Sequence, residues 1–583
     1  MAKTILLSIL IIRGFFITAQ TFSEKYDLHF QNANDCSWDW LKQKTSCRFY
    51  LQAATETGSF APLLIKYDSV YLTENMRFYM KKSIDISMVN AERVEICLIA
   101  KNESDSAVTF TMLGKNEEEN PTFNTSALLE NTSGWDTLYI SASSKTTKTI
   151  NIYIEFKGSK NPEQVISLKE IEIKMDGKPV DKWLNKNNTK ANETATLNPY
   201  YIVDLTKNPD LEKLNDMVDL NHKKIIGLGE NTHGSKSISI ARFEMLKTLI
   251  KFYNCKLILA EKHFDLGMLV DLYVQGIITD ENGIIDGYLR LNNDYEPKKE
   301  FLVWLRKYNS TNKDKVHFLD VDKSGTGELN LALVDYHIEL LGKDKAKPYL
   351  KLIENMNFTG LSDLADSDSL IQNFNDVKNF NYYKKALSTG FSKEMADRFA
   401  ARDSFMFQWV LFLDSLFTQL DEKIAILAHS GHLQKTKNED KTVYFDVLGS
   451  LLNEKYKSGY WSVNFCFGSG TFSQDSCHTF TPVVIDSLKT IPFNSFENAA
   501  LKTGNDYFYY PSAYLDSRLT STAYITRGGR GKNQFSFSTL TNKFDGYIFI
   551  RKSEHFDNLE KWPFYYSLKF FEQKRKQYYQ IIQ

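Results

Sequence analysis

The sequence predicts a protein of two domains, an antiparallel β-sandwich followed by an α/β domain with a mostly parallel sheet. Three observations support this prediction. At 583 residues, the chain exceeds the roughly 250–300 residues at which a single hydrophobic core stops growing. Short runs of alternating polar and apolar residues fill positions 21–180, as in antiparallel strands. From residue 197 onward, continuous apolar runs alternate with segments of helical periodicity, which is typical of a parallel sheet with helices on both faces.

The composition is that of a globular protein, with 42% apolar and 25% charged residues. The formal net charge of -1 gives no reason to expect nucleic acid or an anionic membrane surface as a partner. No internal stretch reaches the about 20 apolar residues that a membrane span needs, so none is expected. Aromatic residues make up 14% of the chain. Stacking on sugars would explain this share, but ordinary core packing is the favoured interpretation.

The first 19 residues have the pattern of a signal peptide. Lys3 provides the positive start, residues 5–12 form a short apolar core, and the small residues Thr18 and Ala19 precede Gln20 as a cleavage site. The sequence therefore predicts an exported protein, located in the periplasm or outside the cell.

Six cysteines are present. Cys36 and Cys47 are close in sequence, and in an exported protein they could close a small loop. We expect Cys97, Cys255 and Cys466, which lie in apolar runs, to be buried thiols. No CxxC spacing occurs, so a cysteine-type zinc site is not expected.

Residues 20–180 form the predicted sandwich, and residues 181–196 form a polar linker without apolar periodicity. The segment EIEIKMDGKPV looks like the last strand of the jelly-roll modules that are attached to secreted carbohydrate-active enzymes. The runs SGWDTLYISAS and KTINIYIEF resemble the strands that precede it there. Two interpretations follow: a glycan-binding module, or a structural appendage of the second domain.

Four apolar runs in residues 197–583 each end on ionisable side chains. The run KKIIGLGENTH, residues 223–233, breaks at Gly229 and at once presents Glu230, Thr232 and His233. The other runs are KLILAEK, ending on Glu261, KVHFLDVD, ending on Asp320 and Asp322, and EKIAILAHSGH, ending on His429 and His432. Ligands of open α/β sheets bind beyond the carboxyl ends of the strands. We therefore expect these side chains to converge on one rim of the sheet.

Helical periodicity separates these strands and also follows the last of them. Residues 395–416 predict a long helix immediately before the histidine run, and the chain is expected to end in an aromatic and lysine-rich helix. Residues 349–387 are polar and poorly periodic. They are expected to be a surface insertion, with a lid over the rim as the alternative.

Several of these stretches resemble the erythromycin esterase family over residues 198–583. GLGENTHGSKSISIARFEML resembles the GExTHG signature with its downstream arginine, and LAEKHF resembles the glutamate at the end of a strand. ILAHSGHLQK resembles the AHNxH motif, with Ser430 where asparagine is usual, and RDSFMFQW resembles RDxxMxxN, with Gln408 in place of asparagine. The resemblance implies a three-layer α/β/α fold shared with haem-binding and metalloprotease relatives. It places Glu230, His233, Arg242, Glu261, His429 and His432 in one cleft.

The resemblance also implies hydrolysis of an ester or lactone, on a macrolide-like small molecule or a glycan. Such hydrolysis needs an activated water, a stabilised oxyanion and a proton for the leaving group. We expect His233 to activate the water, with Glu261 or Glu230 fixing its tautomer. The expected roles of the remaining residues are an oxyanion or carboxylate contact for Arg242, proton donation by His429 or His432, and support from Arg402, Asp403, Asp320, Asp322 and Ser430. No serine lies in a GxSxG elbow.

Two alternatives stay open at this level. No cofactor is required by this mechanism, but a divalent metal would find suitable ligand types in Glu230, His233, Glu261, His429 and His432. The spacing of these residues fits no standard zinc signature. The second alternative is a non-catalytic envelope protein whose cleft binds a glycan or haem.

Overall fold

The structure is a computed structural model. It describes residues 28–30, 39–41, 47–51, 62–67, 77–86, 91–104, 107–116, 121–132, 134–157, 165–180, 195–207, 211–280, 283–290, 295–322, 330–355, 357–369, 371, 377–390, 399–440, 443–474, 484–488, 491–492, 494–523, 525, 534–537, 540–556 and 563–582. The chain divides into two units, residues 1–193 with 529–533, and residues 194–528 with 534–583. The predicted signal peptide, Cys36 and nearly all of the predicted linker lie outside the described residues.

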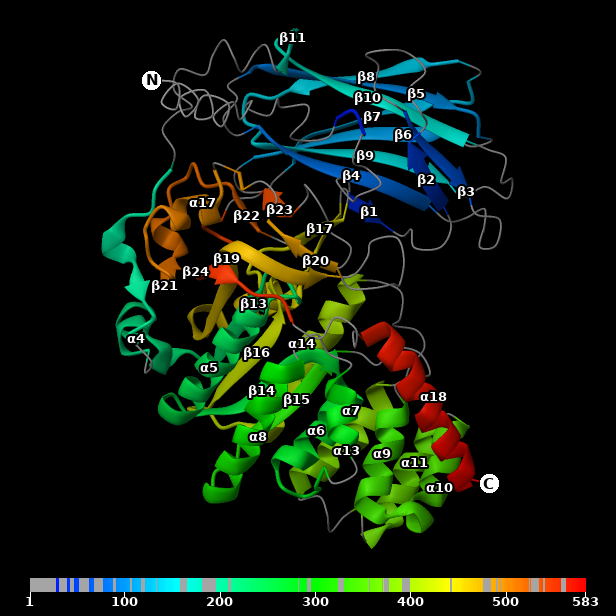
Figure 1. The fold of residues 1–583 in the computed structure, drawn as a ribbon, viewed down its shortest axis with the longest axis vertical. Helices are drawn as coiled ribbons and strands as arrows, with labels where there is room; N and C mark the ends of the chain where they lie inside the picture. Colours follow the sequence, from blue (N-terminus) through cyan, green and yellow to red (C-terminus); the bar gives the residue numbers. More distant parts are fainter. Residues whose placement is uncertain are drawn as a thin grey trace, which may run out of the picture. The chain divides into compact units, whose positions relative to one another are not determined.

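The first unit contains two antiparallel sheets (Figure 1). Their strand orders are β1-β4-β9-β6-β7 and β2-β3-β10-β5-β8, with β11 paired to β10. The strands are β1 (Asp39–Leu41), β2 (Cys47–Leu51), β3 (Leu63–Tyr67), β4 (Arg77–Asp85), β5 (Arg93–Asn102), β6 (Val108–Lys115), β7 (Pro121–Leu129), β8 (Asp136–Ser143), β9 (Thr149–Lys157), β10 (Val165–Met175) and β11 (Lys178–Pro179).

Alternation of side chains explains why most of these strands were predicted. In β5, Val94, Ile96, Leu98 and Ala100 are fully buried at every second position, as expected for a strand with one face in a core. Strand β7 lacks this alternation between buried and exposed side chains, because it lies at the edge of its sheet and its side chains are mostly exposed or half-buried.

The second unit is built on a mixed sheet in the order β12-β21-β24-β19-β13-β16-β14-β15, with β20 paired to β19. The six strands from β24 to β15 run parallel to their neighbours, whereas β12, β21 and β20 pair antiparallel. The bounds are β12 (Val203–Asp204), β13 (Ile225–Glu230), β14 (Cys255–His263), β15 (His317–Asp322), β16 (Lys423–His429), β19 (Tyr460–Gln474), β20 (Val484–Ser487), β21 (Tyr507–Pro511) and β24 (Gly546–Ser553). Two small ribbons pair β17 (Asn438–Asp440) with β18 (Val443–Phe445), and β22 (Ser521–Ala523) with β23 (Phe535–Phe537).

Helices connect these strands, as their apolar periodicity predicts. They are α4 (Glu212–Val218), α5 (Lys236–Phe252), α6 (Phe264–Val274), α7 (Ile284–Leu289), α8 (Tyr295–Thr311), α9 (Asn330–Leu341), α10 (Lys343–Glu354), α11 (Phe358–Ser367), α13 (Val377–Gly390), α14 (Phe399–Phe417), α15 (Ser430–Leu433), α16 (Leu448–Tyr456), α17 (Phe496–Leu501) and α18 (Pro563–Ile582).

The expectation of a surface insertion at residues 349–387 is wrong. Helices α10, α11 and α13 bury Tyr349, Leu361 and Tyr383 in the main core, each at most 1% exposed. Tyrosines explain the error, because their rings pack like apolar groups while their hydroxyls bond to buried partners. The Tyr383 hydroxyl lies 2.8 Å from Nε2 of the buried His337.

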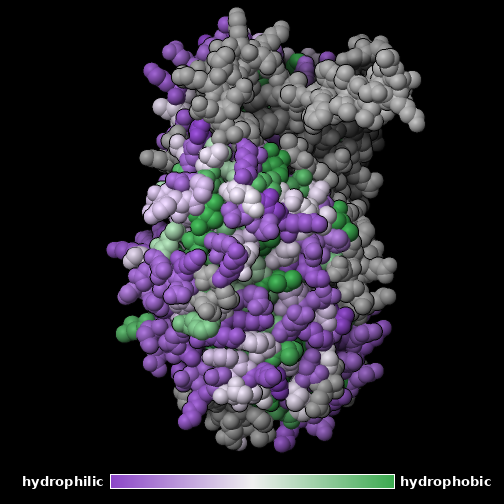
Figure 2. Space-filling view, turned by 60° about the vertical axis from the view of Figure 1, so that its left-hand side comes forward, coloured by the Kyte–Doolittle hydropathy of each residue, from purple (hydrophilic) through white to green (hydrophobic). Residues whose placement is uncertain are grey.

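The described surface and cysteines agree with the composition. Hydrophilic side chains prevail on the coloured surface that Figure 2 shows, with hydrophobic ones interspersed. Cys97, Cys255 and Cys466 are buried free thiols, as predicted. None of the helices in the described part of the chain combines the length and apolarity that a membrane span requires.

Candidate active site

The predicted rim exists, because the four strands that end on ionisable residues are neighbours in the order β13-β16-β14-β15. They run parallel, so their carboxyl ends meet at the same edge of the sheet. Glu230, the last residue of β13, is the register partner of His429, the last residue of β16. Glu261 lies near the end of β14, and Asp322 ends β15.

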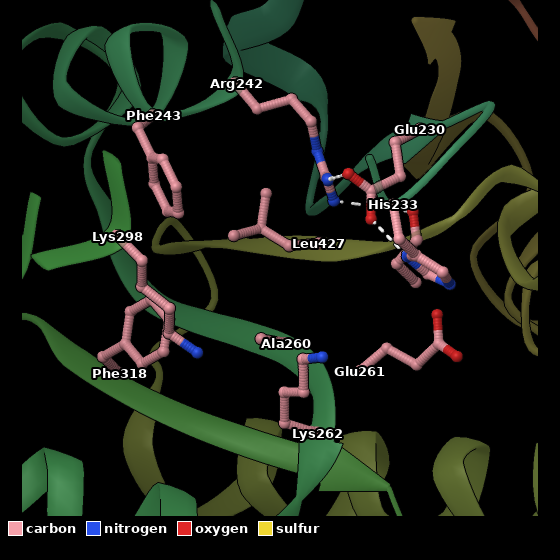
Figure 3. Close-up of a pocket in the computed structure, with 11 residues that line it drawn as sticks. Glu230, His233, Arg242, Phe243, Ala260, Glu261, Lys262, Lys298, Phe318 and Leu427 are labelled. Carbon is pink, nitrogen blue, oxygen red and sulfur yellow. Dashed lines mark hydrogen bonds and ion pairs between the residues drawn. The ribbon is translucent and has the colours of Figure 1, made fainter. Parts of the chain in front are cut away.

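The first motif forms a chain of three charged or polar side chains. His233 Nδ1 lies 2.7 Å from Glu230 Oε1, and the other oxygen of Glu230 accepts from Arg242 Nη1 (Figure 3). Arg242 is buried and also approaches the carbonyl of Ala428 at 3.5 Å. The His233 side chain is 31% exposed, and it makes no other hydrogen bond to the described residues. Its Nε2 is therefore the free nitrogen at the pocket.

The turn between β13 and α5 places His233. Ser235 caps α5 and accepts from the backbone N–H of Ile238 at 3.1 Å. Gly234 is required for close approach, because a Cβ at this position would lie 1.6 Å from the carbonyl oxygen of Ser473. Arg242 follows two turns into α5, which brings its guanidinium back to Glu230.

The second cluster surrounds Glu261. Its Oε1 accepts from Arg402 Nη2 at 2.7 Å and lies 3.2 Å from His432 Nε2. Its Oε2 accepts from the backbone N–H of His429 at 2.8 Å. Arg402 also forms a two-point ion pair with Asp322, at 2.8 and 2.5 Å. Glu261 is thus held by two cations and one backbone donor.

Arg402 and Asp403, expected as a supporting pair, both contact His432, Arg402 at Nε2 and Asp403 at Nδ1. Asp403 is fully buried and lies 2.8 Å from His432 Nδ1 and 2.9 Å from the backbone N–H of Leu448, which donates to it. His432 therefore lies between two carboxylates, Asp403 and Glu261.

These neighbours determine the charges of the cluster. Burial raises the pKa of Glu230, but Arg242 and His233 outweigh it and lower the pKa to about 2. Burial opposes ionisation of Glu261 too, yet His432 helps to hold its pKa well below the usual range. Burial lowers the pKa of His432, but Glu261 and a second carboxylate outweigh this and raise it to about 10. His432 is therefore an imidazolium at neutral pH.

His429 is neutral, in contrast to His432. Burial, together with the nearby His233, lowers its pKa to about 4. Its Nδ1 accepts from the backbone N–H of Gly431 at 3.2 Å, which leaves Nε2 protonated toward the carbonyl of Ile525 at 3.3 Å. The rings of His429 and His233 are 5.1 Å apart.

The other expected supporting residues lie away from the pocket lining. Asp320 is fully buried against Gly267, where a Cβ would come within 2.3 Å of the Asp320 backbone nitrogen. Ser430 is 1% exposed, and its hydroxyl has no hydrogen-bond partner among the described residues.

A pocket of about 480 Å³, measured to its open mouth, lies beside the first motif. The predicted residues in its lining are Glu230, His233, Arg242 and Glu261. The sequence analysis missed the rest of the wall, which consists of Phe243, Ala260, Lys262, Lys298, Phe318, Leu427 and Ala428. Ala260 and Lys262 flank the predicted Glu261 in sequence, so the run LAEKHF could have indicated them as part of the wall. Lys298 lies in the run PKKEF, which belongs to no motif, so the sequence gives no sign that it lines a pocket.

The charge of His432 predicts a pH-dependent stability. Its folded pKa of about 10 lies above the ordinary 6.5, so its contribution is fully present below about pH 6.5 and is lost as the pH rises through 10. At about 1.4 kcal/mol for each unit between the two pKa values, we expect a loss of a few kcal/mol. Urea unfolding from pH 6.5 to 10 measures this loss, and the decline should be smaller in His432→Gln. Equal declines in both proteins would contradict the assigned charge.

The five candidate metal ligands do not fit a metal centre. Within the described ranges, no group of three or more His, Cys, Asp or Glu side chains is placed to hold a metal ion. Apart from Nε2 of His233, the side-chain atoms that would bind a metal are engaged with protein partners instead. Glu230 bonds His233 and Arg242, and His432 lies between two carboxylates. No step of the reaction is therefore derived through a metal.

Comparisons with known proteins agree with the motifs. The erythromycin esterase family model matches residues 344–553, a span that contains the histidine pair and Arg402 but begins after the first motif. Erythromycin esterase type II of Escherichia coli is 24% identical over 259 residues, which cover 36% of this chain and 61% of that protein. The chain thus spans about 61% of the length of this curated relative.

Two solved structures are similar to part of this chain, at lower sequence identity. A Bacillus cereus protein is 20% identical with a TM-score of 0.47, covering 61% of this chain and 96% of that one. A mutant of the erythromycin esterase EreC in its open conformation is 15% identical with a TM-score of 0.41, covering 60% and 96%. The family model and the curated relative thus support the predicted resemblance to erythromycin esterases over part of the chain.

Proposed function

Starting from this similarity to erythromycin esterases, we propose that the second unit hydrolyses an ester or lactone with a water molecule activated by His233. The observation that carries the proposal is the arrangement of His233, which binds Glu230 through Nδ1 and leaves Nε2 at the pocket. A base must reach the proton that it removes. His233 is the histidine in the described lining of the pocket.

Glu230 prepares His233 for this role. It stays ionised, because Arg242 holds its charge, and it accepts the Nδ1 proton of His233. Nε2 therefore keeps its lone pair and can take a proton from water as the oxygen attacks the ester carbonyl. Glu230 also stabilises the imidazolium that forms, as a carboxylate does for a catalytic histidine in hydrolases.

Two steps remain, stabilisation of the oxyanion and protonation of the leaving oxygen. Arg242 and Lys262 line the pocket and supply positive potential where negative charge develops. We assign the proton for the leaving oxygen to the His233 imidazolium. His429 and His432, the donors expected from the sequence, have both ring nitrogens engaged with protein partners.

The proposal places the enzyme outside the inner membrane, on the basis of the signal-like pattern of residues 1–19. Its substrate class is a macrolide-like small molecule or a glycan-linked ester. Both classes present an ester carbonyl. Lactones are included because of the resemblance to erythromycin esterases.

Mass spectrometry tests the function directly. The mature protein is incubated with macrolides, acetylated sugars and model lactones, with and without a chelator. The expected result is a mass gain of one water in a lactone, or release of the acid from an ester, which persists in chelator. Loss of hydrolysis in chelator would contradict the metal-free mechanism. Absence of hydrolysis across the panel, together with ligand binding, would favour the non-catalytic envelope protein.

A further inference from the structure

A buried lysine in the pocket wall has no charged partner among the residues that the structure describes. Lys298 lies in the first turn of α8 and is 2% exposed, yet it lines the pocket. Its ammonium lies 5.2 Å from the centre of the Phe318 ring. Among the described residues, no carboxylate pairs with it and no hydrogen bond holds it. A cation–π contact alone offsets little of the cost of burying a charge.

The carboxylates of the pocket are already engaged. Glu230 is bound by His233 and Arg242, and Glu261 is bound by Arg402 and His432. Neither is therefore available to neutralise Lys298. Buried charges in proteins are paired, so Lys298 is expected to have an anionic partner, which the described carboxylates of the pocket do not provide.

The shape of the pocket places this cation at a distance from the candidate base. In Figure 3, Lys298 lies with Phe243 and Phe318 on one side of the pocket, while Glu230, His233 and Glu261 lie on the other. Ala260 and Leu427 lie between the two sides. A single ligand could thus present a carbonyl to His233 and an anionic group to Lys298, with an apolar connection between them.

We propose that Lys298 forms an anion subsite, and that the substrate is an ester carrying one carboxylate separated from the scissile carbonyl by a short apolar chain. The assignment of an ester as the substrate rests on the proposed function, whereas the anion subsite at Lys298 does not. The single ammonium of Lys298, beside the Phe318 ring, would pair with a single carboxylate of the ligand. The apolar wall of the pocket would strengthen this attraction by excluding water.

Kinetics with two matched esters test the substrate class. The probes are p-nitrophenyl hydrogen glutarate, which is anionic, and p-nitrophenyl hexanoate, which is neutral. We expect the wild type to prefer the anionic ester. In Lys298→Met, the ratio of kcat/KM for the anionic ester to that for the neutral ester should fall by about 10- to 100-fold. Lys298→Arg should retain a larger share of the preference, because it keeps the charge. An unchanged ratio in Lys298→Met would overturn the proposal.

Direct binding separates failure of the subsite from failure of the enzyme function. Calorimetric titration with glutarate needs no turnover. We expect Lys298→Met to bind glutarate at least 10-fold more weakly than the wild type. Lys307→Met, which removes an exposed lysine from the same helix, is the control and should bind like the wild type. Glutarate binding without hydrolysis of any ester would reject the proposed function and retain the subsite. Equal binding by wild type and Lys298→Met would reject the subsite.

Discussion

Replacing His233 with asparagine is expected to lower kcat by about 10²- to 10⁴-fold, the usual contribution of a general base. Asparagine can still donate to Glu230 from the position of Nδ1, but it has no atom equivalent to Nε2. The variant therefore keeps the 2.7 Å contact with Glu230 and loses the lone pair that faces the pocket. Steady-state kinetics on an accepted ester measure the effect, and circular dichroism verifies the fold.

The chain offers a matched control for this substitution. His222 also pairs through Nδ1 with a carboxylate three residues earlier, Asp219, at 2.6 Å, but its side chain is 83% exposed. His222→Asn should leave kcat unchanged within about twofold. A His233→Asn enzyme with the turnover of the wild type would remove His233 from the role of base.

Replacing Glu261 with glutamine is expected to lower the free energy of unfolding by about 3–5 kcal/mol, because it removes one partner of a buried ion cluster. Arg402 and His432 would each lose a carboxylate contact, of 2.7 and 3.2 Å. Glutamine has nearly the same shape, so the loss reflects charge and not packing. Urea unfolding monitored by tryptophan fluorescence measures the change.

Glu244 provides the comparison for Glu261. It pairs with Lys247 at 2.6 Å, but its side chain is 63% exposed, and exposed pairs contribute about 0–1 kcal/mol. Glu244→Gln should therefore change the free energy of unfolding by less than about 1 kcal/mol. Equal effects of the two substitutions would show that the Glu261 cluster does not stabilise the fold.

The sequence predicted the rim because both the strands and their polar ends leave local signals. Continuous apolar runs identified β13, β14, β15 and β16, and each run ended on its ionisable residues. Parallel pairing then makes their convergence a geometric consequence. Strand β21, which pairs with β12 and β24, leaves no such signal, because its aromatic run YFYYP resembles neither alternation nor a continuous aliphatic strand.

The pairing of side chains within the rim could not be predicted. Glu230 and Glu261 were equal candidates for the partner of His233, and only the turn before α5 decides for Glu230. Arg402 and Asp403 are adjacent in sequence and both contact His432, but Arg402 also forms ion pairs with Glu261 and Asp322. No sequence motif indicated Lys298. It stands out only in the structure, because it is buried and because the carboxylates of the pocket are bound to other cations.

The central claim is that water activated by His233 attacks the ester directly. Single-turnover hydrolysis in ¹⁸O-labelled water, with excess enzyme and mass analysis of both product and intact protein, tests it most directly. We expect one ¹⁸O atom in the acid product, no acyl adduct on the protein at any time, and product formation that is about 10²- to 10⁴-fold slower with His233→Asn. An acyl adduct on the protein, or labelled acid formed at the wild-type rate by His233→Asn, would contradict it.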